Sequence, residues 1–386
     1  MTPPTSDTTP NGVEPIRTAP TDTRVRLAVS LQDDRPLAET LELARLAESL
    51  GFAEIWTNEN GHYRGAFTQA AAIAGVTETV GIGIGIVNPF HRHPSVIAME
   101  AATLDELSGG RLRLGIGAAL WNLKNLGEAD PRTARPLTAT VEAIRIIRAL
   151  LRGEPGIESE IFTVSPDAHL DFPTVRPDLP VYVGAVNERM LRAGGIWADA
   201  VELGAIMSVG YVQWALDVIG EGARSVGRDP SSFDIAAPLM VSVAADHREA
   251  RQAVREQLAY YIYRVEAVVT DKAGADPEAI AAVRAAVAER GPVEAAPVVN
   301  DDLIDLFAIA GEPGHVAKRF LEYADAGIKG LIAQHIPGPG RLAGLRLLGT
   351  EVLPVIAERA RADERGADER GADEKGAAGP AAGGVS

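Results

Sequence analysis

Short apolar runs alternate with segments of helical periodicity through most of the chain. The runs expected to form strands are 25–31, 53–57, 80–85, 111–117, 180–183, 200–203, 235–243 and 330–333. The segments expected to form helices are 36–50, 67–74, 94–107, 134–151 and 314–326. In the first of these, apolar residues recur every three or four positions, and Gly51 follows where helices commonly end. The alternation predicts parallel strands joined by crossover helices.

Eight strand–helix units in one chain favour an α/β fold closed into a (β/α)8 TIM barrel over an open doubly wound sheet. Two segments interrupt the rhythm. The segment 156–178 contains three prolines and is expected to be β-rich or irregular, whereas 264–309 is rich in Ala and Val and predicts helices. We expect them to be insertions in the loops after strands 4 and 7. Such loops shape the mouth of a barrel, so both are candidates for a substrate-specific lid or, alternatively, an oligomer interface.

The barrel domain is expected to span 24–358, with a tail at each end. Residues 1–23 are rich in Pro, Thr and Asp, and 359–386 carry Ala-Asp-Glu-Arg/Lys-Gly repeats followed by Gly, Ala, Pro and Ser. This composition is typical of solvated, disordered extensions, since it offers little to bury. A charged tail that binds a partner is the alternative.

The composition excludes several classes of site and partner. The 386 residues include no cysteine, which rules out disulfides, thiolate metal sites and a cysteine nucleophile. With 37 Lys and Arg against 53 Asp and Glu, the net charge of −16 argues against nucleic-acid partners. No basic start followed by an apolar stretch is present, nor about 18 consecutive apolar residues. We therefore expect a cytoplasmic enzyme with a small-molecule substrate and no membrane partner.

The segment 81–94 carries the strongest local signal. Glycine occupies alternate positions of a strand at Gly81, Gly83 and Gly85, an arrangement that weakens a strand and needs a reason. Either a flat ring approaches the backbone closely, or a neighbouring element packs tightly against it. The pair Asn88-Pro89 then favours an extended or turn conformation directly after the strand.

This segment resembles a known enzyme family. The motif Asn-Pro-Phe-His-Arg-His-Pro at 88–94, followed by 101–111 and by Leu-Gly-Ile-Gly at 114–117, is similar to the signature of bacterial luciferase-like flavin enzymes. It resembles most the deazaflavin-dependent branch that includes methylene-tetrahydromethanopterin reductase. A second match is Leu-Pro-Val-Tyr-Val-Gly-Ala at 179–185, and the resemblance extends over about 24–358.

The resemblance implies a cofactor site at the barrel mouth. It implies a cis peptide bond between Gly85 and Ile86, which forms a bulge behind the cofactor ring, while Asn88 holds the following turn. It also implies that the cofactor phosphate lies near the loop after the fifth strand, where the donors are expected to come from the residues Gly184, Ala185 and Asn187. The cofactor is expected to be coenzyme F420, with FMN as the alternative.

The loop 117–125 is a second candidate for phosphate binding. Its backbone N–H groups, including that of Ala118, can cradle an anion, and Asn122 and Lys124 can supplement them. Many members of the family carry Thr, Gly or an acidic residue near 118–121, and this chain does not.

The end of the second strand supplies the candidate catalytic residues, Glu59 and Asn60, because barrel enzymes place catalytic groups at the carboxyl ends of strands. Glu59 can relay a proton or bind a cofactor hydroxyl. Relatives that oxidise sugar phosphates or alcohols carry an Asp-His pair near these positions, and the sugar-phosphate enzymes carry an acid where this chain has Leu120. Sugar-phosphate oxidation is therefore not expected. His62 is a weaker candidate, for which a position in a mobile loop is the favoured interpretation.

The pair His91 and His93 does not predict a metal site, since no acidic third ligand lies nearby. Arg92, between them, is expected to pair with an acid or to contact the next barrel element. The glycines of 81–85 lack the spacing of a dinucleotide-binding fingerprint, and the chain has no nucleophile elbow.

These observations predict a deazaflavin-dependent oxidoreductase that transfers a hydride between its cofactor and a small organic substrate. One alternative is an FMN-dependent luciferase-like monooxygenase. Another is a non-catalytic flavin-binding relative, suggested by the missing histidine at position 60 and the apolar Leu120. A homodimer is expected from the resemblance.

Overall fold

A computed structural model describes residues 24–31, 34–119, 134–154, 158–204, 206–334, 340–363 and 365. Its strands are β1 (Arg26–Ser30), β2 (Glu54–Thr57), β3 (Gly81–Val87), β4 (Leu112–Ile116), β5 (Val181–Gly184), β6 (Ala200–Glu202), β7 (Asp234–Val243), β8 (Ile309–Gly311) and β9 (Gly330–Gln334). Its main helices are α1 (Leu37–Leu50), α2 (Ala66–Ala74), α3 (Pro94–Ser108), α5 (Pro136–Arg152), α6 (Glu188–Trp197), α7 (Val209–Ser225), α8 (His247–Arg264), α9 (Ala267–Lys272), α10 (Pro277–Ala295), α11 (Asp301–Phe307), α12 (Pro313–Asp325) and α13 (Arg341–Leu347).

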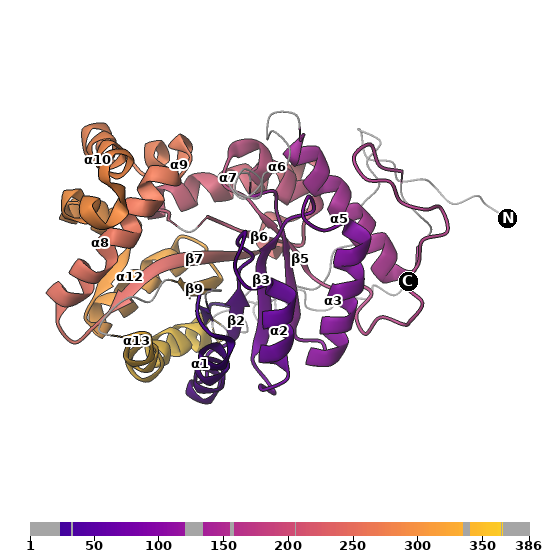
Figure 1. Cartoon of the computed structure of the whole chain (residues 1–386), viewed down its shortest axis with the longest axis horizontal. Helices are drawn as coiled ribbons and strands as arrows, with labels where there is room; N and C mark the ends of the chain where they lie inside the picture. The colour runs from indigo at the N-terminus through magenta and orange to yellow at the C-terminus, as the bar shows by residue number, and fades with distance from the viewer. Residues whose placement is uncertain are drawn as a thin grey trace, which may run out of the picture.

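Eight parallel strands close into a barrel, which confirms the predicted fold. Each of β1 to β6 pairs with the next strand in the chain. Strand β7 pairs with β9, and β9 pairs with β1, which closes the barrel. The helices surround this barrel (Figure 1). The short strand β8 is an addition outside the barrel, since it pairs only with Val241–Val243 at the outer end of β7. The predicted helical insertion over 264–309 is therefore wrong at its end, because Ile309 begins this strand.

The helical insertion after the seventh strand is present. Helices α8 to α11 and strand β8 lie between β7 and α12, the helix that leads into the last barrel strand. Figure 1 shows α8, α9 and α10 gathered at one end of the molecule, beyond the outer part of β7. The insertion begins at His247 rather than at the predicted residue 264.

The second interruption lies elsewhere than expected. Residues 158–178 contain no strand and follow helix α5, so they belong to the connection into β5 and not to the loop directly after β4. The segment nevertheless returns to the first turns of α5, where Ser159 Oγ donates to Glu142 over 2.5 Å. Phe162 packs edge-on against His93 at the start of α3, with ring centroids 5.9 Å apart. Its beginning therefore packs beside the helix ends that face the barrel mouth.

The two ends of the chain are described only in part. Residues 353–363 are helical, and Arg359 forms an ion pair with Asp325 of α12 over 2.5 Å. Residues 1–23 and 366–386 lie outside the described residues, so the predicted tails stay predictions. In the part of the chain that is described, no helix has the length and apolar character needed to cross a membrane.

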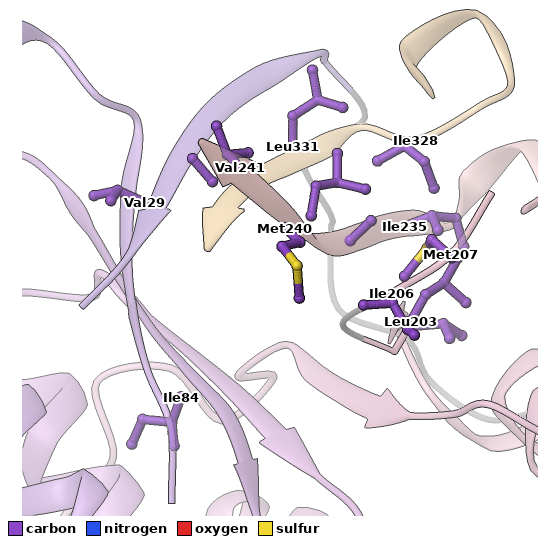
Figure 2. Packing of buried hydrophobic residues seen from close by; sticks show 14 of the residues in the cluster. Val29, Ile84, Leu203, Ile206, Met207, Ile235, Met240, Val241, Ile328 and Leu331 are labelled. Atoms are coloured by element: carbon purple, nitrogen blue, oxygen red, sulfur yellow. The ribbon is translucent and has the colours of Figure 1, made fainter. Parts of the chain in front are cut away.

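The core has two parts. The larger cluster lies between the barrel and its helices, and Figure 2 shows a portion around β7 that includes Ile235, Val241 and Leu331. The smaller cluster fills the barrel interior and consists of Ala28, Trp56, Tyr182, Ala200, Ala236 and Ile332. Trp56 and Tyr182 meet edge to face with centroids 5.4 Å apart. A Cβ atom at Gly83 would overlap the indole of Trp56, so tight packing explains this glycine.

Buried charges close the barrel below this layer. Arg26 of β1 donates to Glu54 of β2 and, through both terminal nitrogens, to Asp234 of β7 over 3.1 and 2.5 Å. Arg113 of β4 lies 2.6 Å from the same Glu54 carboxylate. The side chains of Glu54 and Asp234 are 1% and 0% exposed. Two positive and two negative charges therefore neutralise one another away from water, which buried charges require.

The aromatic pair is joined to this network. Trp56 Nε1 donates to Glu54 Oε2 over 2.7 Å, and the Tyr182 hydroxyl donates to Asp234. Each of the two buried carboxylates therefore accepts a hydrogen bond from an aromatic side chain in addition to its ion pairs.

Removing one charge from this network should destabilise the fold. Glu54→Gln leaves two buried guanidinium groups facing one remaining carboxylate, and the expected loss in the free energy of unfolding is about 3–5 kcal/mol. Urea denaturation of wild type and variant measures it. Glu188→Gln, which breaks the exposed pair with Arg192, is the matched control and should leave the denaturation midpoint unchanged. Equal midpoints for wild type and Glu54→Gln would contradict the prediction.

Candidate functional site

The carboxyl ends of β3, β4 and β5 form one wall of the barrel mouth. The peptide bond between Gly85 and Ile86 is cis, as the resemblance implies. The pairing of β3 with β4 shifts register between Ile84 and Val87, so this part of β3 leaves the regular ladder. Gly85 and Ile86 are both half-buried, which leaves part of each facing outward.

Glycines on the neighbouring strands make room for Ile86. A Cβ atom at Gly117 would lie 3.0 Å from Ile86 Cδ1, and one at Gly184 would lie 3.0 Å from its Cγ2. A Cβ atom at Gly115 would be closer still, at 2.9 Å. The glycine pattern of β4 and β5 therefore produces a smooth apolar wall, in which Ile86 covers backbone rather than side chains.

Asn88 holds the turn after β3, as predicted. Its Oδ1 accepts from Phe90 N over 2.9 Å, and its Nδ2 donates to the carbonyl of Ala118. Asn88 is only 1% exposed, and Ala118 is also buried. Both residues shape the loops beneath the mouth, and Asn88 ties the end of β3 to the end of β4.

The loop after β5 leads directly into helix α6. Asn187 caps this helix, because its Oδ1 accepts from Met190 N over 3.1 Å. The N–H of Ala185 donates to the Glu202 carbonyl over 3.0 Å, so it serves the sheet and not a phosphate. The first-turn N–H groups of α6 are the donors that a helix start offers to an anion.

The candidate catalytic residues lie at the end of β2. Glu59 forms an ion pair with Arg92, and Arg92 Nε lies 3.2 Å from Glu100 Oε2. The guanidinium also stacks over the Phe67 ring at 5.5 Å. The prediction that Arg92 pairs with an acid is confirmed. Asn60 is half-buried, and its carbonyl accepts from Tyr63 N over 3.2 Å.

The pKa of Glu100 depends on its burial and on the charges of Arg92 and Glu59. Burial raises the pKa of Glu100, Arg92 opposes the shift, and Glu59 adds to it. Two carboxylates thus share one guanidinium at the rim, and this cluster can hold a charged or protic group of a substrate.

The remaining residues singled out in the sequence either have a structural role or lie outside the described residues. His93 caps helix α3 through Nδ1, which accepts from Ser95 N over 3.2 Å. His62 adopts a positive φ of 69° in an exposed turn. Asn122, with Leu120 and the rest of 120–133, lies outside the described residues. Among the residues that are described, no cluster of three or more His, Asp or Glu side chains could hold a metal ion.

Glu202 is a site residue that the sequence analysis does not identify. It ends β6, is 7% exposed, and places its carboxyl group against Gly85 and Gly115. Burial raises the pKa of Glu202 to about 8. A sequence signal was present, since Glu202 is the only acidic residue within the apolar run 200–203. Its inward direction follows only from the closed barrel, where Ala200, two positions earlier, belongs to the interior layer.

Comparisons with known proteins agree with this architecture. The 5,10-methylenetetrahydromethanopterin reductase of Archaeoglobus fulgidus is 30% identical over 338 residues, which cover 86% of this chain and 99% of that protein. An F420-dependent glucose-6-phosphate dehydrogenase of Microbacterium testaceum is 28% identical over 337 residues, covering 83% and 94%. The solved structure of the coenzyme F420 dependent tetrahydromethanopterin reductase of Methanopyrus kandleri has a TM-score of 0.80 and 27% identity, covering 86% of this chain and 99% of that one.

The family model described as luciferase-like monooxygenase matches residues 18–330, which include every barrel strand except most of β9. Together with the shared fold, this match over most of the chain establishes its membership. The chain belongs to the luciferase-like monooxygenase family.

Proposed function

We propose that this protein is an F420-dependent oxidoreductase that transfers a hydride between the deazaflavin and a small organic substrate. The observation that carries the proposal is the wall in which Ile86 covers Gly117 and Gly184 at the barrel mouth. The relatives of known name support it, since both the Archaeoglobus and the Methanopyrus proteins are reductases that align over nearly their full length.

The residues at the mouth fit such a cofactor. A flat ring needs an apolar surface, and the Ile86 side chain, which packs on the glycines at 117 and 184, provides one. An anionic tail needs donors, and the start of α6, capped by Asn187, provides them beside the wall. Bound F420 supplies a carbon-centred hydride carrier that reacts poorly with oxygen.

The protein positions the reactants and handles the proton. Ile86, held between β4 and β5, orients the ring, and Asn88 keeps the end of β3 in place. Glu59 is proposed to face the substrate, where its carboxylate accepts or returns a proton at Oε. Arg92 holds Glu59 in place through their ion pair. Assembly as a homodimer stays a prediction.

Cofactor choice is the first test. Purified protein is titrated with F420 and FMN in parallel and followed by fluorescence. We expect F420 to bind at least about tenfold more tightly, a difference of roughly 1.4 kcal/mol. Tighter binding of FMN, with oxygen consumption by the reduced complex, would make the monooxygenase alternative correct. Binding without turnover of any substrate by the reduced complex would favour the non-catalytic relative, and binding of neither cofactor would overturn the proposed function.

The wall itself can be tested at Gly184. Gly184→Val places a branched side chain against Ile86, where even a Cβ atom would lie only 3.0 Å away. We expect F420 affinity to fall at least about tenfold, because the side chain intrudes on the ring surface. Gly314→Val is the matched control, since no atom lies within 4 Å of a Cβ at that position. If the folded Gly184→Val protein binds F420 with unchanged affinity, the wall is not part of the cofactor site.

The proposed role of Glu59 predicts a loss confined to turnover. With reduced F420 and methylenetetrahydromethanopterin as the probe substrate, Glu59→Gln should lower kcat by about 10²–10⁴-fold. The Kd for F420 should stay the same. Glu100→Gln is the control, because it also removes an acid from Arg92 but keeps Glu59. If kcat falls equally in the two variants, the effect comes from a displaced Arg92 side chain and not from loss of the Glu59 carboxylate.

A further inference from the structure

The Glu202 carboxyl group is buried without a protein partner. Its Oε2 atom has no solvent exposure and no hydrogen-bond partner among the described residues. A buried carboxylate in this state is costly, since it gives up hydration and receives nothing in return. The position therefore requires a neutral carboxylic acid, a water molecule or a ligand.

The group fills the space beneath the cofactor wall. A Cβ atom at Gly85 would overlap both carboxyl oxygens of Glu202, and one at Gly115 would lie 3.2 Å from Oε2. The Ile86 side chain packs on the same Gly115, at 2.9 Å from that Cβ position. Glu202 and Ile86 thus share one small region, with Glu202 inside the barrel and Ile86 at the mouth.

The ionisable groups on the adjacent strands are already paired. Arg113 of β4 binds Glu54, and the Tyr182 hydroxyl of β5 donates to Asp234 of β7. Strand β3 carries no ionisable residue. Burial is accordingly the cause that raises the pKa of Glu202 to about 8, so the group is a neutral acid near pH 7.

We propose that Glu202 is a positioning residue whose neutral carboxyl group supports the Gly85–Ile86 wall from inside the barrel, so that its ionisation weakens cofactor binding. The role rests on the proposed function, in which this wall receives F420. An ionised carboxylate needs water or a cation beside it, and on the side of Gly85 the Glu202 carboxyl group lies directly against the β3 backbone, in the space that a Cβ atom would take. Ionisation therefore displaces the backbone of β3 on which Ile86 depends.

The first experiment measures cofactor affinity against pH for wild type, Glu202→Gln and Glu221→Gln, a control that removes an exposed carboxylate paired with Arg192. Wild type and Glu221→Gln should lose about tenfold or more in affinity between pH 7 and pH 9.5, beyond any change intrinsic to F420. Glu202→Gln should change less than about twofold over the same range after the same correction. Parallel profiles for all three proteins would overturn the positioning role. If only FMN binds, the same comparison is made with FMN.

The second experiment needs no cofactor. Because the folded-state pKa exceeds the unfolded value of 4.5, the folded protein retains a proton that the unfolded chain releases between these pH values. The folding equilibrium constant of wild type relative to Glu202→Gln should therefore fall by up to about tenfold per pH unit between about pH 5 and 8, then level off. Chemical denaturation at each pH measures it. If the ratio of the two folding equilibrium constants does not change with pH, Glu202 is not a neutral acid in the folded protein, whatever the result of the cofactor experiment.

The two experiments separate the possible failures. Absence of binding by either cofactor, together with the expected stability profile, would reject the proposed function and with it the positioning role, while the neutral acid stands. If Glu202→Gln does not fold, Glu202→Met replaces it, because that side chain has similar length and cannot ionise.

Discussion

Arg26 joins three strands through one guanidinium group. Its contacts reach Glu54 on β2 and Asp234 on β7, which are strands far apart in the sequence and close only in the finished barrel. The attraction is strong because the surroundings exclude water, and it would be a penalty if any partner were missing. The packing above it, from the aromatic pair to the wall at the mouth, depends on the strand positions that these charges select.

Large side chains in the barrel and at its mouth are matched by glycines on neighbouring strands. Gly83 receives Trp56, and Gly117 and Gly184 receive Ile86. Each glycine weakens its own strand, but a larger residue would displace an aromatic ring or the wall. Of the two explanations open at the level of the sequence, tight packing accounts for Gly83 and Gly85, whose Cβ positions would meet Trp56 and Glu202, while close approach of a cofactor ring stays a prediction.

The barrel could be predicted from the sequence because buried parallel strands are apolar on both faces and their helices are amphipathic, so each unit has a distinct pattern. Strand β8 could not be predicted, since Ile309–Gly311 has only three residues and follows helix α11 after a single residue. Glu202 was missed for a different reason. One acid in a strand is most simply a solvent-facing position, and only closure of the barrel turns it inward. The cis bond at Gly85–Ile86 came from family resemblance, because no local pattern specifies it.

Strand β7 serves two sheets with one continuous backbone. Residues Ala236–Met240 pair with β9 in the barrel, and Val241–Val243 pair with β8 at the edge of the helical insertion. The insertion is therefore attached by a rigid ladder rather than by a linker alone. In evolutionary terms, its helices can be exchanged or lengthened while β8 keeps their docking edge, so the insertion can change without rebuilding the barrel.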